Sequence, residues 1–175
     1  MAQWSNVDAF TLLENTFGGS GYDIACAQNA HPIVYQRQNS TPHIKIVAFD
    51  PPFKDELFFV HRNQKQNSRE AIAHYNTLKT KQRLDFSELN ALTEAILVAT
   101  TLEEFEVLIS KHETIVGTLI QQQPLKTTHF ADYPGAVKSL GAWGGDFFLA
   151  TGNNHHYFKD KGYTTIIPFE DMVGF

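Results

Sequence analysis

The sequence predicts an α+β fold in which an antiparallel β-sheet is backed by helices. Two observations lead to this class. From residue 57 onward, short apolar segments and longer segments with helical periodicity follow in the order strand, helices, strand, strand, helix, strand. A glycine-rich stretch separates the two middle strands, as expected for the connection of a hairpin. With 175 residues, the chain suits one domain or little more.

The first fifty residues predict two helices followed by two strands. In the first helix Phe10 and Leu13 share one face, and the pair Gly18-Gly19 ends it. Ser20 or Asp23 is the predicted cap of the second helix, because short polar side chains accept hydrogen bonds from free backbone N–H groups. The predicted ranges are 7–16 and 24–28 for the helices and 33–37 and 44–49 for the strands.

The residues from Leu57 onward predict a β-α-β-β-α-β order, and Pro51-Pro52 separates them from the strand before. Thr101 and Glu104 form a capping box at the start of the longest helix, whose apolar positions recur at helical spacing. This order is that of a split β-α-β, or ferredoxin-like, unit with an expanded first helical layer. The predicted strands are 57–61, 136–139, 147–151 and 163–168, and the predicted helices are 68–81, 86–99, 101 onward and 154–161.

Histidine and cysteine side chains receive structural interpretations. His112 falls on the apolar face of the helix that begins at Thr101, which favours a core histidine with satisfied hydrogen bonds over a catalytic one. Cys26 lies between alanines, which favours a buried structural thiol over a nucleophile. The side chains of the adjacent pair His155-His156 would diverge from a helix or a strand, so these histidines predict no metal site.

Composition and charge exclude several classes of function. The formal net charge is −5 and no cluster of Lys and Arg occurs, which argues against general nucleic-acid binding. No long apolar run or signal peptide is visible, so no membrane partner is expected. The single cysteine excludes an intrachain disulfide and suits a reducing compartment. These features together predict a cytoplasmic protein.

Two glycine-rich segments are the strongest candidates for a site. Residues 141–145 read Gly-Ala-Trp-Gly-Gly, and residues 18–23 read Gly-Gly-Ser-Gly-Tyr-Asp before a helix. Glycine loops and helix N-termini present backbone N–H groups to anions, so both indicate a site for a phosphorylated or anionic small molecule. The structural alternatives are a bulged hairpin loop for the first segment and a helix C-cap followed by an N-cap for the second. The first segment also lacks the endings and spacings of a P-loop or a dinucleotide fold.

A third candidate is the polar stretch from Lys65 to Arg69, which follows a predicted strand and precedes a predicted helix. Lys65 offers a cation, and Ser68 lies at the start of the helix, so both are candidate anion-binding residues. An ordinary solvated turn explains the same residues equally well.

Taken together, the two glycine segments resemble those of the GHMP kinases, a family that includes galactokinase, homoserine kinase, mevalonate kinase and phosphomevalonate kinase. Residues 141–145, preceded by Lys138, resemble the family's C-terminal glycine-rich motif. Residues 19–23 resemble the stretch that carries the catalytic aspartate, and Gly-Tyr-Asp-Ile-Ala at 21–25 matches the name of the bacterial GYDIA subgroup. Asp146 follows the glycines as an Asp commonly does in phosphomevalonate kinase. The resemblance covers the chain from Ala2 to its end.

This resemblance implies a remnant of the N-terminal kinase domain over 1–52 and the C-terminal kinase domain over 53–175. It implies that ATP and Mg²⁺ are cofactors and that the partners are ATP and a small-molecule substrate of the mevalonate or phosphomevalonate type. Asp23 would be the catalytic residue, accepting a proton from a substrate hydroxyl or orienting it. The implied substrate- or phosphate-binding residues are Ser20, Gly21, Lys138, Gly141, Ala142, Gly144 and Gly145.

The chain departs from the family pattern in three respects. The central motif Pro-x-x-x-Gly-Leu-Gly-Ser-Ser and the N-terminal strands that hold a basic residue near the substrate are absent. Trp143 replaces a usual glycine, and Leu140 a usual Ser or Thr. We therefore expect the C-terminal part of a kinase, with upstream sequence missing and no turnover on its own. The alternative is a non-catalytic small-molecule or protein-binding module that retains the fold.

Overall fold

The computed structural model describes residues 7–16, 18–38, 41–64, 73–78, 85–141 and 145–173, and all statements below concern these residues. The chain divides into two compact units, Met1–Phe49 and Asp50–Phe175. The sequence analysis placed the boundary between residues 52 and 53, beside the Pro51-Pro52 pair. Each unit is described separately.

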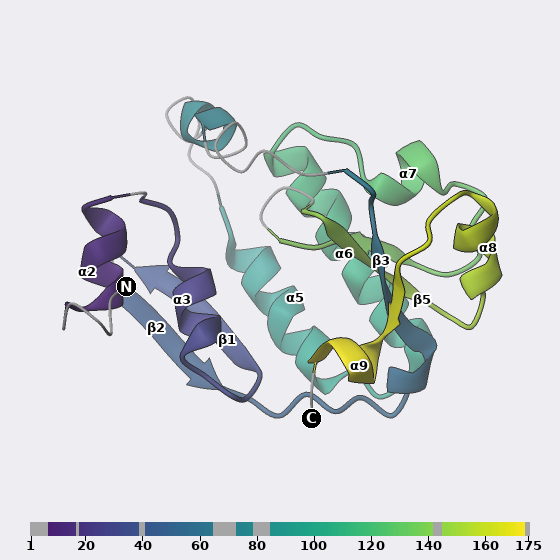
Figure 1. Cartoon of the computed structure of the whole chain (residues 1–175), viewed down its shortest axis with the longest axis horizontal. Helices are drawn as coiled ribbons and strands as arrows, with labels where there is room; N and C mark the ends of the chain where they lie inside the picture. Colours follow the sequence, from purple (N-terminus) through teal and green to yellow (C-terminus); the bar gives the residue numbers. More distant parts are fainter. Residues whose placement is uncertain are drawn as a thin grey trace. The chain divides into compact units, whose positions relative to one another are not determined.

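The first unit contains two short helices and a β-hairpin (Figure 1). Asp8 caps α2 by accepting a hydrogen bond of 2.7 Å from the Thr11 N–H, and the N–H of Gly18 closes the helix on the Leu13 carbonyl at 2.8 Å. The two strands pair antiparallel, with Ile33 opposite Ile46. The elements are α2 (Ala9–Glu14), α3 (Tyr22–Ala27), β1 (Ile33–Gln38) and β2 (Thr41–Ile46).

Two predictions for this unit were wrong. The second strand was expected over 44–49 but spans Thr41–Ile46, because Pro42 is tolerated in a strand that pairs on one side only. Asp23 is not the cap of α3: the N-cap is Gly21 with a left-handed φ of 78°, and Asp23 lies in the first turn. Of the two predicted caps, the Ser20 hydroxyl does accept a hydrogen bond from the Tyr22 N–H at 3.2 Å.

The second unit is built on a four-stranded sheet with the strand order β4-β5-β3-β6. All three pairings are antiparallel. Numbered within the unit, this order is 2-3-1-4, which confirms the predicted ferredoxin-like arrangement. Strands β3 (Leu57–His61) and β5 (Phe147–Thr151) match their predicted ranges, whereas β4 (Val137–Ser139) and β6 (Ile166–Pro168) are shorter than predicted.

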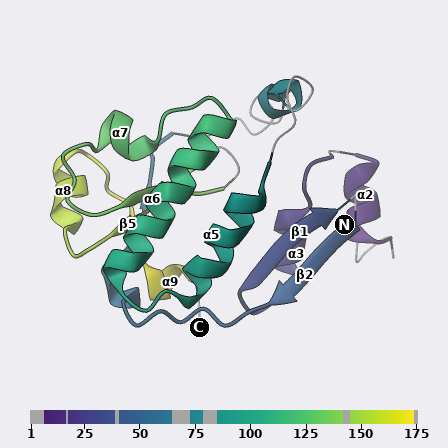
Figure 2. The ribbon, with the colours of Figure 1, turned by 180° about the vertical axis from the view of Figure 1, so that it is seen from behind.

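Helices cover this sheet and connect its strands. Figures 1 and 2, taken from opposite sides, show α5 and α6 on one face of the sheet. Thr101 caps α6 as predicted, since its Oγ1 accepts from the Glu104 N–H at 3.2 Å. Residues 73–78 are also helical. The remaining elements are the short 3-10 helix η1 (Lys54–Glu56), α5 (Ser87–Val98), α6 (Leu102–Leu119), α7 (Leu125–His129), α8 (His155–Asp160) and α9 (Phe169–Val173).

An aromatic cluster forms the core of the second unit. Phe58 and Phe148 lie on the same face of the sheet. Phe148 pairs with Val60, and Val60 is two residues after Phe58, so the three side chains point to the same side. Phe130 packs on Phe148 with ring centroids 5.0 Å apart, and Phe158 lies 5.2 Å from Phe130. Burying each such side chain stabilises the fold by about 1.5–3 kcal/mol. This core holds the β4–β5 hairpin in place.

Candidate functional site

The first candidate segment is a loop whose carbonyls are held by side chains from β1. Gly18, Gly19 and Gly21 all have positive φ, which only glycine adopts at low cost. The Arg37 guanidinium donates to the Gly19 carbonyl, and the Tyr35 hydroxyl donates to the Ser20 carbonyl. A Cβ at Gly21 would lie 2.8 Å from the Phe10 ring, so this position requires glycine for space as well. The loop therefore has a defined shape that leads directly into α3.

Asp23 is exposed in the first turn of α3, free of the capping role. A carboxylate at this position is favoured by the partial positive charge of a helix N-terminus. Cys26 is exposed as well, which corrects the predicted buried thiol. The buried residue of α3 is Ala25. Cys26 follows it and is rotated by about 100° around the helix axis, away from the buried face.

The second candidate segment is the connection of the β4–β5 hairpin, as predicted. Gly141 has a φ of 70°, and the Gly145 N–H donates to the Leu140 carbonyl at 2.6 Å. That N–H is therefore engaged within the hairpin. A Cβ at Gly145 would approach the Leu140 oxygen to 3.1 Å, whereas at Gly141 the nearest atoms are 3.8 Å away. The predicted site residues Ala142 and Gly144, with Trp143 between them, lie outside the described residues, as do Lys65 and Ser68.

Two glutamates of α6 accept hydrogen bonds at β4, an edge strand of the sheet: one from the residue before the strand and one from its last residue. Glu106 Oε1 accepts from the Ala136 N–H at 3.3 Å, and Glu113 Oε1 accepts from the Ser139 N–H at 3.1 Å. The spacings agree, because seven helical residues and three strand residues each span about 10 Å. Glu113 thus provides an acceptor for an N–H group at the edge of the sheet, whereas the Ala136 N–H also donates to Thr151 Oγ1 of β5, at 2.7 Å.

Glu113 makes the closest contacts at the base of the glycine hairpin. Besides the Ser139 N–H, it accepts from the Ser139 hydroxyl at 2.5 Å, and its Oε2 lies 3.8 Å from the Lys138 Nζ. Glu113 is only 7% exposed. The sequence analysis did not identify this residue. The phase of the buried stripe of α6, formed by Phe105, Ile109, Glu113 and Gly117, would have revealed it as a carboxylate among core positions.

Lys138, a predicted phosphate-binding residue, is largely buried beside Glu113. Its ammonium donates to the Ser139 carbonyl at 3.1 Å. Burial lowers the pKa of Lys138, and the Glu113 carboxylate opposes that change. The side chain is therefore a cation that already has an internal counter-charge.

His112 lies next to this group and departs from its prediction. It is half-buried on α6, but its Nδ1 is buried and has no hydrogen-bond partner among the described residues, so it is not the satisfied core histidine that was expected. Burial, with a smaller contribution from the Lys138 charge, lowers the pKa of His112 to about 4. At neutral pH this imidazole is uncharged.

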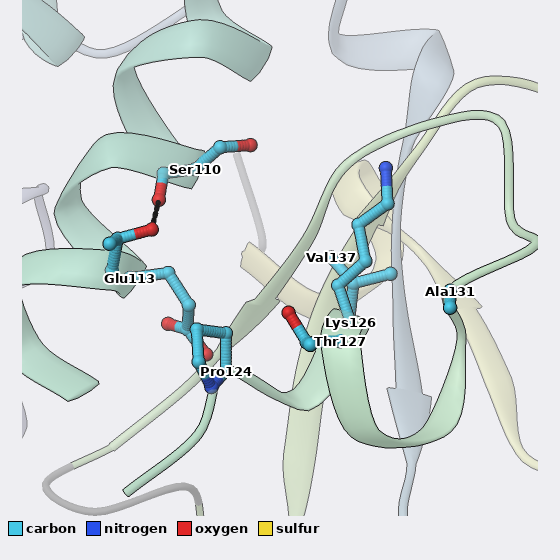
Figure 3. A pocket seen from close by; sticks show the side chains of 8 residues that line it. Ser110, Glu113, Pro124, Lys126, Thr127, Ala131 and Val137 are labelled. Atoms are coloured by element: carbon cyan, nitrogen blue, oxygen red, sulfur yellow. Dashed lines mark hydrogen bonds between the residues drawn. The ribbon is translucent and has the colours of Figure 1, made fainter. Parts of the chain in front are cut away.

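Glu113 also lines a cavity of about 270 Å³ (Figure 3). Ser110 and Glu113 line it from α6, and Lys126 and Thr127 line it from α7. The Lys126 ammonium donates to the Gly135 carbonyl at 2.6 Å. Glu113 is thus shared between this cavity and the base of the glycine hairpin.

The described residues contain no group of three or more His, Cys, Asp or Glu side chains that could hold a metal ion. Within the same residues, no helix combines the length and apolar character needed to cross a membrane. Ser20, Gly21 and Asp23 belong to the first unit, and Lys138, Gly141 and Gly145 belong to the second. The structure therefore describes two separate groups of predicted site residues.

Comparison with known proteins gives a structural match. The chain is similar to L. major mevalonate kinase, solved in complex with R-mevalonate, with a TM-score of 0.59 and 19% sequence identity. The match covers 83% of this chain and 48% of the kinase chain, so this chain spans about half the length of that protein. No family model and no curated protein matches the sequence. The chain has an α+β fold, with helices backing antiparallel sheets, that is similar to the corresponding part of a mevalonate kinase.

Proposed function

We propose that this chain is part of an ATP-dependent small-molecule kinase of the GHMP type. The observation that carries the proposal is the likeness to mevalonate kinase over 83% of the chain. The resemblance of the two glycine segments to GHMP motifs supports it, and their described residues Gly18, Gly19, Gly21 and Gly141 have positive φ next to regular elements. We place this activity in the cytoplasm from composition alone.

The proposed reaction transfers the γ-phosphoryl group of ATP to a hydroxyl or phosphate of a small metabolite of the mevalonate or phosphomevalonate type. Such catalysis consists mainly of positioning and charge stabilisation. In this chain the glycine hairpin, with Gly141 and Gly145, would approach the phosphates, and Lys138 would supply a cation. Asp23 would accept or orient the substrate hydroxyl proton, with Ser20 and Gly21 beside it. ATP would be the cofactor with Mg²⁺, for which we assign no ligand in this chain.

Nucleotide titration of the purified chain tests this proposal. We expect MgATP to shift the backbone NMR signals of Ser139, Leu140 and Gly141, and Gly141→Ala to weaken binding by straining the hairpin. Gly162→Ala is the matched control, because Gly162 also has a positive φ of 86° with open space around it but lies in another loop. Equal binding by both variants, or no response of the hairpin in the wild type, would contradict the proposal.

A second candidate is a non-catalytic binding module with the same fold, since the Gly145 N–H is already bonded within the hairpin and Lys138 already has a counter-charge. Both candidates predict that the 175-residue chain has no measurable turnover, since each lost phosphate-binding donor costs about 2.7–4 kcal/mol of transition-state stabilisation. A form extended upstream separates them: a kinase gains ATP-dependent phosphorylation of mevalonate or phosphomevalonate, and a binding module does not. Steady turnover by the short chain would refute both expectations.

A further inference from the structure

We propose that Glu113 is the positioning residue of the glycine hairpin: it fixes the strand that enters the hairpin and holds the Lys138 ammonium until an anion takes its place. This inference rests on the proposed function for the identity of that anion, a phosphate group. The contacts that carry it belong to the second unit alone.

The strand is fixed by two hydrogen bonds to one carboxylate oxygen. Both donors belong to Ser139, the last residue of β4, with distances of 3.1 Å from the N–H and 2.5 Å from the hydroxyl. Ser139 is followed by Leu140 and then by Gly141, where the backbone turns into positive φ. Bonds to a charged acceptor are stronger than neutral ones, and this carboxylate is largely removed from water. Glu113 therefore determines where the hairpin begins.

The second carboxylate oxygen faces the cation. Glu113 Oε2 lies 3.8 Å from Lys138 Nζ, a distance at which the charges attract but form no close hydrogen bond. The Lys138 ammonium has three donors; in the described part of the chain it donates to the Ser139 carbonyl at 3.1 Å and faces this carboxylate. A phosphate oxygen at the hairpin would compete with Glu113 for the same ammonium. The nearby imidazole of His112 is uncharged at neutral pH and does not change this balance.

Glu106 supplies a matched control within the same helix. It accepts from the N–H of Ala136, the residue before β4, which also donates to the Thr151 hydroxyl oxygen at 2.7 Å, and it accepts a hydrogen bond from that hydroxyl. It lies two helical turns before Glu113, at the end of β4 that is far from the hairpin. A role limited to accepting backbone hydrogen bonds near β4 predicts the same effects from both glutamates, whereas the proposed role predicts effects on Lys138 and the hairpin from Glu113 alone.

The experiment compares Glu113→Gln and Glu106→Gln in the full chain, each after thermal unfolding has shown a cooperative transition. Glutamine retains an acceptor oxygen for Ser139 and removes only the charge. The pKa of Lys138, followed by NMR at its ε-methylene, is expected to fall by about one unit in Glu113→Gln and to stay unchanged in Glu106→Gln. Should Glu113→Gln fail to fold, Glu113→Asp, which moves the charge away by one methylene, is expected to give a smaller fall.

Inorganic tripolyphosphate serves as the anion probe at pH 7. Because the competing carboxylate is lost, Glu113→Gln is expected to bind it about three- to tenfold more tightly than wild type, and Glu106→Gln is expected to match wild type. An unchanged Lys138 pKa, or equal affinity in both variants, would overturn the role of Glu113. Absence of binding in all three proteins would overturn the phosphate site of the proposed function, and the Lys138 pKa would still decide on Glu113.

Discussion

At the scale of single residues, the structure separates the two roles that the sequence allowed for Asp23. A helix cap must precede the first turn, and in α3 that position belongs to Gly21. Asp23 lies inside the turn with its side chain exposed, so its charge interacts with the helix end but satisfies no orphan N–H group as a cap would. A substitution of Asp23 therefore tests the proposed chemistry without removing a helix cap.

Asp23→Asn is expected to leave stability within a few tenths of a kcal/mol, because only a helix-dipole interaction at an exposed site is lost. In a form of the protein that turns over, the same change is expected to lower the rate by about 10²–10⁴-fold through loss of general-base catalysis. Urea denaturation measures the first effect and a coupled kinase assay the second. Unchanged turnover on the true substrate would remove Asp23 from the catalytic machinery.

His112 predicts a pH-dependent stability. Its pKa in the folded chain, about 4, lies below the ordinary value of 6.5, so folding opposes its protonation. The corresponding stability is fully present above pH 6.5 and is lost as the pH falls toward 4. His112→Leu, which cannot titrate, is expected to lose less stability between pH 7 and pH 5 than wild type in urea denaturation. The exposed residue His129 gives the control variant His129→Gln, and equal pH responses in both variants would contradict the assignment.

At the scale of elements, the β4–β5 hairpin depends on packing from other helices. Phe148 of β5 is fully buried and contacts Phe130, which follows α7, and Phe158 of α8. The hairpin that carries the glycines is thus supported by rings from outside it. Loss of that support should affect the whole unit, because this aromatic cluster joins the sheet to α8 and to the segment after α7.

Phe148→Ala is expected to lower the free energy of unfolding by about 3–5 kcal/mol, the cost of lost burial plus a cavity. Phe86→Ala, at a phenylalanine that is 41% exposed before α5, is the control and should cost less than about 1 kcal/mol. Chemical denaturation followed by tryptophan fluorescence or circular dichroism measures both. Similar losses for the two variants would mean that the aromatic cluster is not the core of the unit.

At the scale of the whole molecule, the two units differ in the internal packing that stabilises each of them. In the first unit the buried residues among those described are Gly21 and Ala25, and its sheet has two strands. The second unit has a four-stranded sheet and the aromatic core. An isolated two-stranded hairpin is marginally stable at best, whereas more strands with a packed face can fold alone.

Residues 50–175 expressed alone are therefore expected to unfold cooperatively, and residues 1–49 alone to show no cooperative transition. Thermal melts followed by circular dichroism, together with the dispersion of amide NMR signals, check both fragments. A cooperative transition in the 1–49 fragment would show that the first unit contains a core of its own.

The sequence by itself determined the order of the elements, and with it the fold class. Apolar periodicity and glycine punctuation act within a few residues, so β3 and β5 were placed correctly and the hairpin between β4 and β5 was recognised. The same local signals located the candidate glycine segments. These signals failed where the structure depends on contacts with other segments. The extent of β2 and the N-cap of α3 are the two examples.

Only the tertiary structure decided the contacts between distant residues. Glu113 and Ser139 are 26 positions apart, and nothing local indicates that one oxygen of this glutamate receives both donors of the serine. The sequence placed His112 and Lys138 on separate elements. Only packing showed that Nδ1 of His112 lacks a hydrogen-bond partner in the described part of the chain and that Lys138 has a buried counter-charge. Hydrogen bonds and ion pairs act over a few ångströms in space, whereas sequence patterns report only neighbours along the chain. For this reason the residues of the candidate phosphate site could be proposed from the sequence, whereas the charges around Lys138 could be described only from the fold.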